Sequence, residues 1–132
     1  MGEILKGLTD LNTSLLIFTV TILGSLVTSV TSNAATASLL IPIALDISEK
    51  TQTHPFLITF PLTISISYAF CLPISTAPNA VVYANGRVKI LDMVTSGLIM
   101  NLVGSLILTV CTLTYGRYMF EMDVVPSWAL RL

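Results

Sequence analysis

Side chains capable of binding chemistry gather at two places in an otherwise apolar chain. One is the run TSNAAT at residues 31–36, and the other is PISTAPNA at residues 73–80. Both combine hydroxyl and amide groups with residues that interrupt a helix, since Ser and Asn favour helix starts and proline lacks a backbone N–H. Neither run contains an acidic or basic residue. An ion bound at either place would therefore be held by backbone dipoles and neutral side chains.

Helix ends supply both signs of charge for such a site. The C-terminal end of a helix presents free carbonyls and suits a desolvated cation, whereas the N-terminal end presents free N–H groups and suits a carboxylate. We expect carbonyls of residues 31–33 and 73–76 to ligate one cation. The side chains that would hold an anion are Ser32, Asn33, Thr36, Thr76 and Asn79. A simpler alternative is that Ser32 only caps a helix and the prolines only kink one.

The composition places these residues in a membrane. Of the 132 residues, 54% are hydrophobic and 10% are charged, against about 25% charged in ordinary soluble domains. The mean hydropathy is +0.88. Uncharged stretches cover residues 11–45, 51–86 and 93–116. Because one helical crossing needs about 20 residues, the third stretch fits one crossing and the first two must be interrupted.

The first uncharged stretch predicts a re-entrant helical hairpin. Its second arm reaches the charged turn at Asp46 too soon to cross a bilayer. We place the tip at residues 31–36, which dip into the membrane and return to the same side. Non-helical backbone at that depth is tolerated only where it is buried in protein or lines a watery cavity. The tip is therefore a candidate site.

The second stretch predicts a broken transmembrane helix and the third a continuous one. His54 and Pro55 are a reasonable helix start, and the prolines at 73 and 78 predict a break over residues 73–79. In the last helix, Gly97, Asn101 and Gly104 share one face and would permit close packing. Gly116 would end that helix.

The positions of Lys and Arg predict the orientation. Arg87 and Lys89 lie in one loop, which we expect to be cytoplasmic, so that the hairpin enters from outside. The predicted elements are an N-terminal flank (1–12), the hairpin (13–47), an external loop (48–55), the broken helix (56–84), a cytoplasmic loop (85–92), a continuous helix (93–116) and a C-terminal tail (117–132).

Several other functions are excluded on the same grounds. A net charge of -1 gives no reason to expect nucleic acid. Cys71 and Cys111 lack metal-ligand spacing and are expected to pack in apolar surroundings. His54 has no partner spaced for a catalytic dyad and is expected to be a solvated helix start. We therefore expect no enzyme and no cofactor other than a coupling ion.

Three segments resemble one transporter family. They are TSNAAT at 31–36, LPISTAPNAVVY at 72–83 and TYGRYMFEMDVVPSWA at 114–129. They are similar to the divalent anion:sodium symporters of the solute carrier 13 group, and the similarity runs from about Leu15 to the C-terminus. The resemblance implies an all-α elevator-type transporter with two inverted repeats. This chain is similar to the second repeat and is therefore half of that architecture.

The resemblance also implies roles for individual residues. In the family, the hairpin tip and the helix break together hold one sodium ion and contact substrate carboxylates. With neighbouring backbone included, the expected sodium ligands are Thr31, Ser32, Asn33, Thr76, Ala77, Pro78 and Asn79. This chain departs from the family pattern at three positions. Ala34 replaces a Thr, Ala77 replaces the first of two prolines, and Ser29 stands where several animal carboxylate transporters have Glu.

The implied function is that of a C-terminal fragment of a secondary active transporter. It would move succinate-like or citrate-like anions with Na⁺, and the full-length form would be a multi-pass homodimer in the plasma membrane. Sodium-independent exchange and sulfate transport remain open for that full-length form. A different alternative is a small structural or regulatory membrane protein that binds a relative through the face formed by Gly97, Asn101 and Gly104.

Overall fold

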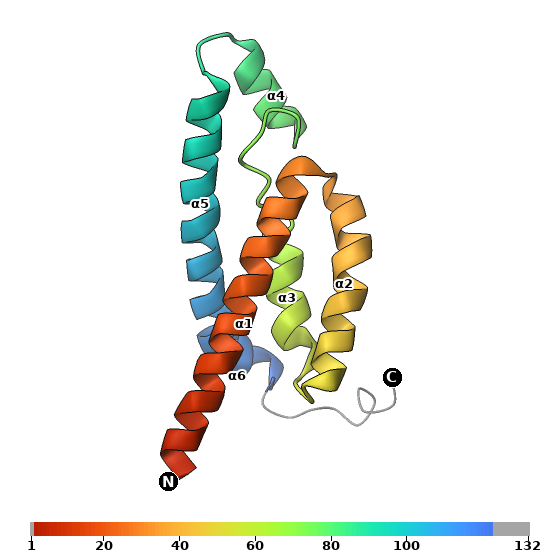
Figure 1. Ribbon diagram of the computed structural model, residues 1–132, viewed down its shortest axis with the longest axis vertical. Helices are drawn as coiled ribbons and strands as arrows, with labels where there is room; N and C mark the ends of the chain where they lie inside the picture. The colour runs from red at the N-terminus through yellow and green to blue at the C-terminus, as the bar shows by residue number, and fades with distance from the viewer. Residues whose placement is uncertain (1, 123–132) are drawn as a thin grey trace.

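The computed structural model describes residues 2–122, with side chains described from Thr13 onward. This part of the chain is helical and contains no strand, which confirms the all-α prediction (Figure 1). The elements are α1 (Gly2–Val30), α2 (Asn33–Lys50), α3 (Pro55–Ser65), α4 (Ala77–Ala84), α5 (Ile90–Cys111), the π-helix η1 (Thr112–Gly116) and α6 (Arg117–Phe120). The part of the predicted tail beyond residue 122 lies outside the described residues.

Helices α1 and α2 form the hairpin. Only residues 31 and 32 lie between the two helices, so residues 33–36 of the predicted tip are the first turn of α2. Ser32 has an extended backbone and its hydroxyl accepts the N–H of Ala35 at 3.2 Å. This is the N-cap predicted from Ser and Asn at this point.

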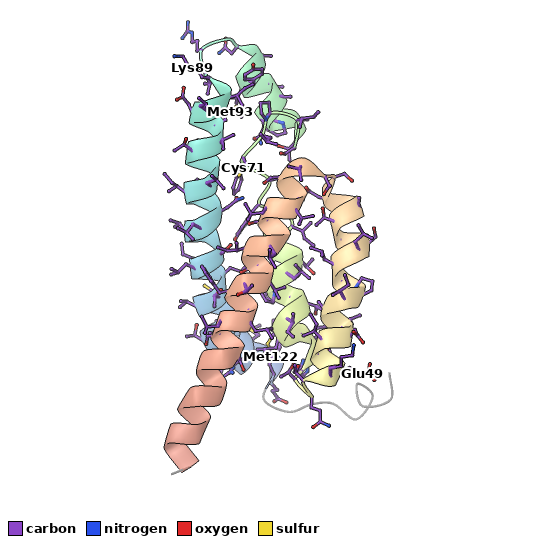
Figure 2. The ribbon with its side chains drawn as sticks, in the orientation of Figure 1. Glu49, Cys71, Lys89, Met93 and Met122 are labelled. Atoms are coloured by element: carbon purple, nitrogen blue, oxygen red, sulfur yellow. The ribbon has the colours of Figure 1, made fainter. Side chains whose placement is uncertain are left out.

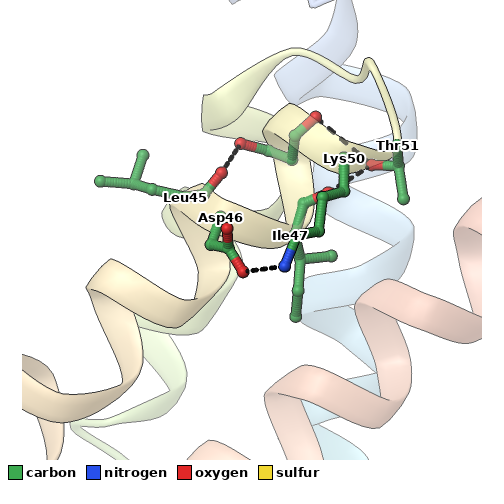
Figure 3. Close-up of polar contacts among 6 residues, drawn as sticks. Leu45, Asp46, Ile47, Lys50 and Thr51 are labelled. Carbon is green, nitrogen blue, oxygen red and sulfur yellow. Dashed lines mark hydrogen bonds and ion pairs between the residues drawn. The ribbon is translucent and has the colours of Figure 1, made fainter. Parts of the chain in front are cut away.

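The far end of α2 is closed by polar contacts in an exposed turn (Figure 3). Lys50 Nζ lies 2.7 Å from Asp46 Oδ2, one turn earlier. This hydrogen bond raises the pKa of the Lys50 ammonium group above 10.5. Thr51 donates its N–H and its hydroxyl to the carbonyl of Ile47. The pair is solvated and contributes little stability, but it marks the end of the hairpin.

Helices α3 and α4 are the two halves of the broken helix. His54 caps α3 and Pro55 is its first residue, as predicted. Helix α3 ends at Ser65, and residues 66–76 follow without helix, so the break begins before the predicted residue 73. Pro78 lies in the first turn of α4, where a missing N–H has no helical partner to lose.

Helix α5 runs along the whole bundle and continues past its predicted end (Figure 1). After Cys111 the chain passes through η1 and α6 without leaving the helical path. Gly116 therefore does not end the helix. The end comes at Glu121, whose left-handed backbone has a φ of 46°.

Within the described residues, two helical segments are long and apolar enough to cross a membrane, Thr13–Val30 and Ile90–Phe120. Each contains an 18-residue window with a mean hydropathy of 1.9. Helix α3 packs between the two hairpin arms, α1 and α2, where Ile58, Leu62 and Ile66 form a buried cluster with Ala44 of α2 (Figure 1). Many large apolar side chains of α5 point outward and are about half exposed. Such a surface suits lipid.

Candidate functional site

The hairpin tip and the helix break lie in contact. Ser75, in the break, donates its hydroxyl proton to the carbonyl of Ser29, in the last turn of α1. In Figure 1, the turn between α1 and α2 lies beside the segment that leads into α4. Helices α2 and α4 start here and run in opposite directions. Their N-terminal ends therefore direct partial positive charge toward the same region.

Short polar contacts hold the hairpin tip. The hydroxyls of Thr31 and Thr36 lie 2.6 Å apart, and Thr36 also donates to the carbonyl of Ser32 at 3.0 Å. Thr36 is buried, whereas Ser32 is exposed. The hydroxyl of Thr36 thus fastens the first turn of α2 to the end of α1, and its contact with an anion stays a prediction.

Asn33 presents one end of its amide to the protein. Its Oδ1 accepts the hydroxyl proton of Thr28 at 2.6 Å. The side chain is half-buried, and the NH₂ group, which carries two donors, is the end that remains for a ligand. Two N–H donors suit a carboxylate.

Asn79 is turned the opposite way. Its Nδ2 donates to the carbonyl of Ala69 at 2.7 Å and to that of Leu72 at 3.1 Å. Both amide protons are thereby used to hold the break, and Oδ1 remains as an acceptor. An oxygen acceptor suits a cation. The sequence grouped Asn33 and Asn79 as equivalent anion donors, and the geometry separates them.

The start of α4 retains unused donors. Thr76 is the N-cap of α4 with an extended backbone, but its hydroxyl makes no capping hydrogen bond. Ala77 and Pro78 are exposed, and Thr76 is half-buried. A hydroxyl and a helix N-terminus that lack a cap are free to meet an oxyanion.

Helix α5 supports the break from behind. A Cβ atom placed on Gly97 would lie 2.6 Å from Cys71 Cα and 2.7 Å from the carbonyl oxygen of Phe70. Asn101 Nδ2 lies 3.4 Å from Cys71 Sγ. The spacing of Gly97, Asn101 and Gly104 in the sequence predicted a packing face. The structure shows that the segment between α3 and α4 packs on this face. Since this face is covered by the chain's own break, it is not available to a partner in this arrangement.

The remaining candidate groups are His54 and the two cysteines. His54 is buried rather than solvated, because its Nδ1 accepts the N–H of Phe56 and the ring packs near Phe56. Burial lowers the pKa of its imidazole below the usual value of 6.5. Cys71 is buried and Cys111 is exposed. Among the described residues, no group of three His, Cys, Asp or Glu side chains could hold a metal ion.

Apolar helices of membrane length, a hairpin tip joined to a helix break and two converging helix N-termini define part of a membrane transport protein built from discontinuous helices. The chain matches the model of one such family, described as the sodium:sulfate symporter transmembrane region, over residues 1–122. The chain therefore belongs to the sodium:sulfate symporter family, in agreement with the resemblance identified from its motifs.

Curated relatives lie in the same family. The chain is 43% identical to the Na(+)/citrate cotransporter of Mus musculus over 105 residues, which cover 80% of this chain and 18% of the relative. It is 33% identical to Na(+)/dicarboxylate cotransporter 3 of Homo sapiens over 129 residues, or 98% of this chain and 21% of the relative. For solute carrier family 13 member 2 of Oryctolagus cuniculus the identity is 36% over 86% of this chain and 19% of the relative. The chain thus spans about a fifth of the length of these relatives.

Proposed function

We propose that this chain carries one half of the substrate and sodium site of a secondary active transporter that moves di- or tricarboxylates together with Na⁺. The observation that carries the proposal is the hydrogen bond from Ser75 to the carbonyl of Ser29, because it joins the two helix interruptions into one site. The names of the relatives, which are sodium-coupled citrate and dicarboxylate cotransporters, support the choice of substrate and ion.

In this site, the amide of Asn33 binds the anion and the amide of Asn79 binds the cation. The NH₂ group of Asn33, the hydroxyls of Ser32 and Thr76 and the N-terminal ends of α2 and α4 contact the carboxylates. Oδ1 of Asn79 faces the cation. Further sodium ligands come from the two interruptions. They are the backbone carbonyl of Asn33 and backbone or side-chain oxygens of Thr31, Ser32, Thr76, Ala77 and Pro78. Thr36 acts by holding the tip in shape.

The site is open on one side. Ser32, Ala34 and Ala35 of the tip and Ala77 and Pro78 of the break are exposed. An unsatisfied polar backbone group at membrane depth costs several kcal/mol, so this face needs a cover. The part of the relatives that this chain does not span is a natural cover, and a first inverted repeat would bring the matching half-site. The full-length transporter would be a homodimeric elevator in the plasma membrane.

Transport kinetics of a full-length protein test whether Asn33 binds the anion and Asn79 the cation. We suggest a chimaera in which this chain replaces the segment that it matches in the Na(+)/citrate cotransporter of Mus musculus. Since hydrogen bonds to charged groups contribute about 1.5 to 3 kcal/mol, Asn33→Ala should raise the KM for citrate roughly tenfold or more, with little change in sodium activation. Asn79→Ala should raise the sodium concentration for half-activation.

Asn85→Ala is the matched control for both variants, since Asn85 is the exposed C-cap of α4. Its citrate and sodium kinetics should stay near those of the parent chimaera. Unchanged kinetics in both Asn33→Ala and Asn79→Ala, at normal surface expression, would overturn the proposed site.

The orientation is testable by labelling. Figure 2 shows Glu49 and Lys89 at opposite ends of the bundle. With Cys111 replaced by Ser, cysteines introduced at Glu49 and at Lys89 should react from opposite sides of the membrane, with Glu49 outside. Labelling of both from one side would contradict the hairpin arrangement.

Sulfate is the second candidate substrate, because the matching family model is described as a sodium:sulfate symporter region. Hydroxyl and amide donors suit any oxyanion. Competition of unlabelled sulfate against citrate uptake in the chimaera distinguishes the two, and strong inhibition by sulfate would favour the second candidate.

A further inference from the structure

Two polar groups on one face of α5 are buried without a protein partner. The side chain of Asn101 is 3% exposed and that of Ser105 is 0% exposed. Within the described part of the chain, Asn101 Oδ1 and Ser105 Oγ make no hydrogen bond. Both lie inside the apolar segment Ile90–Phe120, and bulk water does not reach such groups in a membrane-spanning helix. Each group would therefore carry the cost of a buried polar atom that is not satisfied.

Exchanging the two ends of the Asn101 amide does not remove this cost. Asn101 Nδ2 lies 3.4 Å from Cys71 Sγ, and a thiol can donate a hydrogen bond as well as accept one. Either end of the amide can therefore pair with Cys71, and the opposite end is then left without a partner. A small molecule that both donates and accepts satisfies that end in either case.

A cavity of about 250 Å³ lies beside Asn101, between α1 and α5. Ser25 of α1 is its other polar lining residue. The Ser25 hydroxyl donates its proton to the carbonyl of Ile22 at 2.9 Å, so its oxygen can still accept. The rest of the lining is apolar and consists of Ile22, Leu26, Leu98 and Leu102. A bound water needs about 30 Å³ and two to four polar partners, and the polar end of this cavity provides both.

We propose that one ordered water molecule is bound at this polar end and bridges Asn101, Ser105 and Ser25. It donates to Asn101 Oδ1 and to Ser25 Oγ, and it accepts the hydroxyl proton of Ser105. Side chains four residues apart on a helix have Cβ atoms about 5 to 6 Å apart, and one water spans about that distance between two partners. The water links α5 to α1 at the level where Asn101 contacts Cys71 of the break.

Water fits this place better than a sodium ion does. The three oxygens come from neutral side chains, and they lie in the interior of α1 and α5 rather than at a helix end that would add partial charge. A water also satisfies the amide in both orientations, whereas a cation requires its oxygen.

Cryo-electron microscopy of the chimaera tests the water directly. We expect density for one water within hydrogen-bonding distance of the Asn101 amide and of Ser105 Oγ, in a map that shows ordered waters elsewhere in the protein. An empty position in such a map, or an acyl chain that fills the cavity, would overturn the inference.

Ser105→Ala tests the same water through the stability of the chimaera. Removal of a hydroxyl that has no partner would leave the unfolding temperature unchanged or raise it, whereas removal of a partner of the water should lower it by about 2 °C. Ser48→Ala is the matched control, because Ser48 is 2% exposed but donates within its own helix, to the carbonyl of Leu45. A loss in Ser105→Ala that is no larger than in Ser48→Ala would overturn the inference.

Two further measurements identify the occupant. In an Asn101→Leu background, Ser105→Ala should add almost nothing, because the bridge has already lost its other end. A loss as large as in the parent would overturn the inference. The loss in Ser105→Ala should also be the same in sodium and in choline buffer. A loss seen only in sodium would identify a bound cation and overturn the assignment of water.

Discussion

The hairpin tip and the helix break both interrupt helices in the bundle, but they are built differently. At the tip, only residues 31 and 32 lie outside a helix, and apart from the bond between Ser75 and Ser29 its hydrogen bonds join residues at most five positions apart. The break extends over residues 66–76 and is held by side chains from elsewhere, including Asn79 and the glycine face of α5. The tip is therefore held by local contacts and the break by tertiary contacts. Substitutions at positions distant in the sequence, such as those in α5, should destabilise the break but not the tip.

The largest effect is expected at Gly97. Alanine there would place a Cβ atom 2.6 Å from Cys71 Cα, which is backbone and cannot rotate away. Overpacking of this kind costs about 1 to 3 kcal/mol. Gly97→Ala in the chimaera should lower the thermal unfolding temperature and reduce citrate uptake strongly, as measured by detergent-solubilised melting and by radiolabelled uptake.

Gly116→Ala provides the matched control for this substitution. A Cβ atom at Gly116 would meet its nearest neighbours at 3.7 Å, an ordinary contact distance. Its unfolding temperature should stay near that of the parent. Equal behaviour of the two variants would contradict the view that α5 supports the break.

Because the tip is held by local contacts and the break by tertiary contacts, the sequence could predict the tip better than the break. The caps at Ser32 and His54 follow local rules that one residue and its next neighbours decide, and both are found. The start of the break was missed because residues 66–72 contain no Pro or Gly. The carbonyls of Ala69 and Leu72 are satisfied by Asn79, and a partner so far along the chain is invisible to a local pattern. The orientation of the Asn79 amide depends on these partners and was missed for the same reason.

A moderate effect is expected at Ser75, which joins the two regions. Ser75→Ala removes the hydrogen bond to the carbonyl of Ser29. A net contribution of about 0.5 to 1.5 kcal/mol is typical, so we expect a several-fold reduction in uptake rate with a small loss of stability. Ser67→Ala, at an exposed position of the same segment, should leave both unchanged. Equal uptake by the two variants would mean that tip and break do not depend on this link.

The smallest effect is expected for a cap change at the tip. Ser32→Gly removes the side-chain bond to the N–H of Ala35, but glycine is itself tolerated at an N-cap and the cost is about a few tenths of a kcal/mol. The unfolding temperature of the chimaera should therefore change little. A stability loss as large as that of Gly97→Ala would show that the tip is not the local structure described above.

The central claim is that this chain holds half of a sodium-coupled anion site, and reconstitution tests it most directly. The purified 132-residue chain and the chimaera would be placed in separate liposomes, and citrate uptake driven by an inward sodium gradient would be measured against empty liposomes. The account predicts sodium-dependent uptake by the chimaera and none by the chain alone, because the exposed tip and break lack the facing half of the site and a scaffold to move against. Sodium-driven uptake by the chain alone would contradict the account.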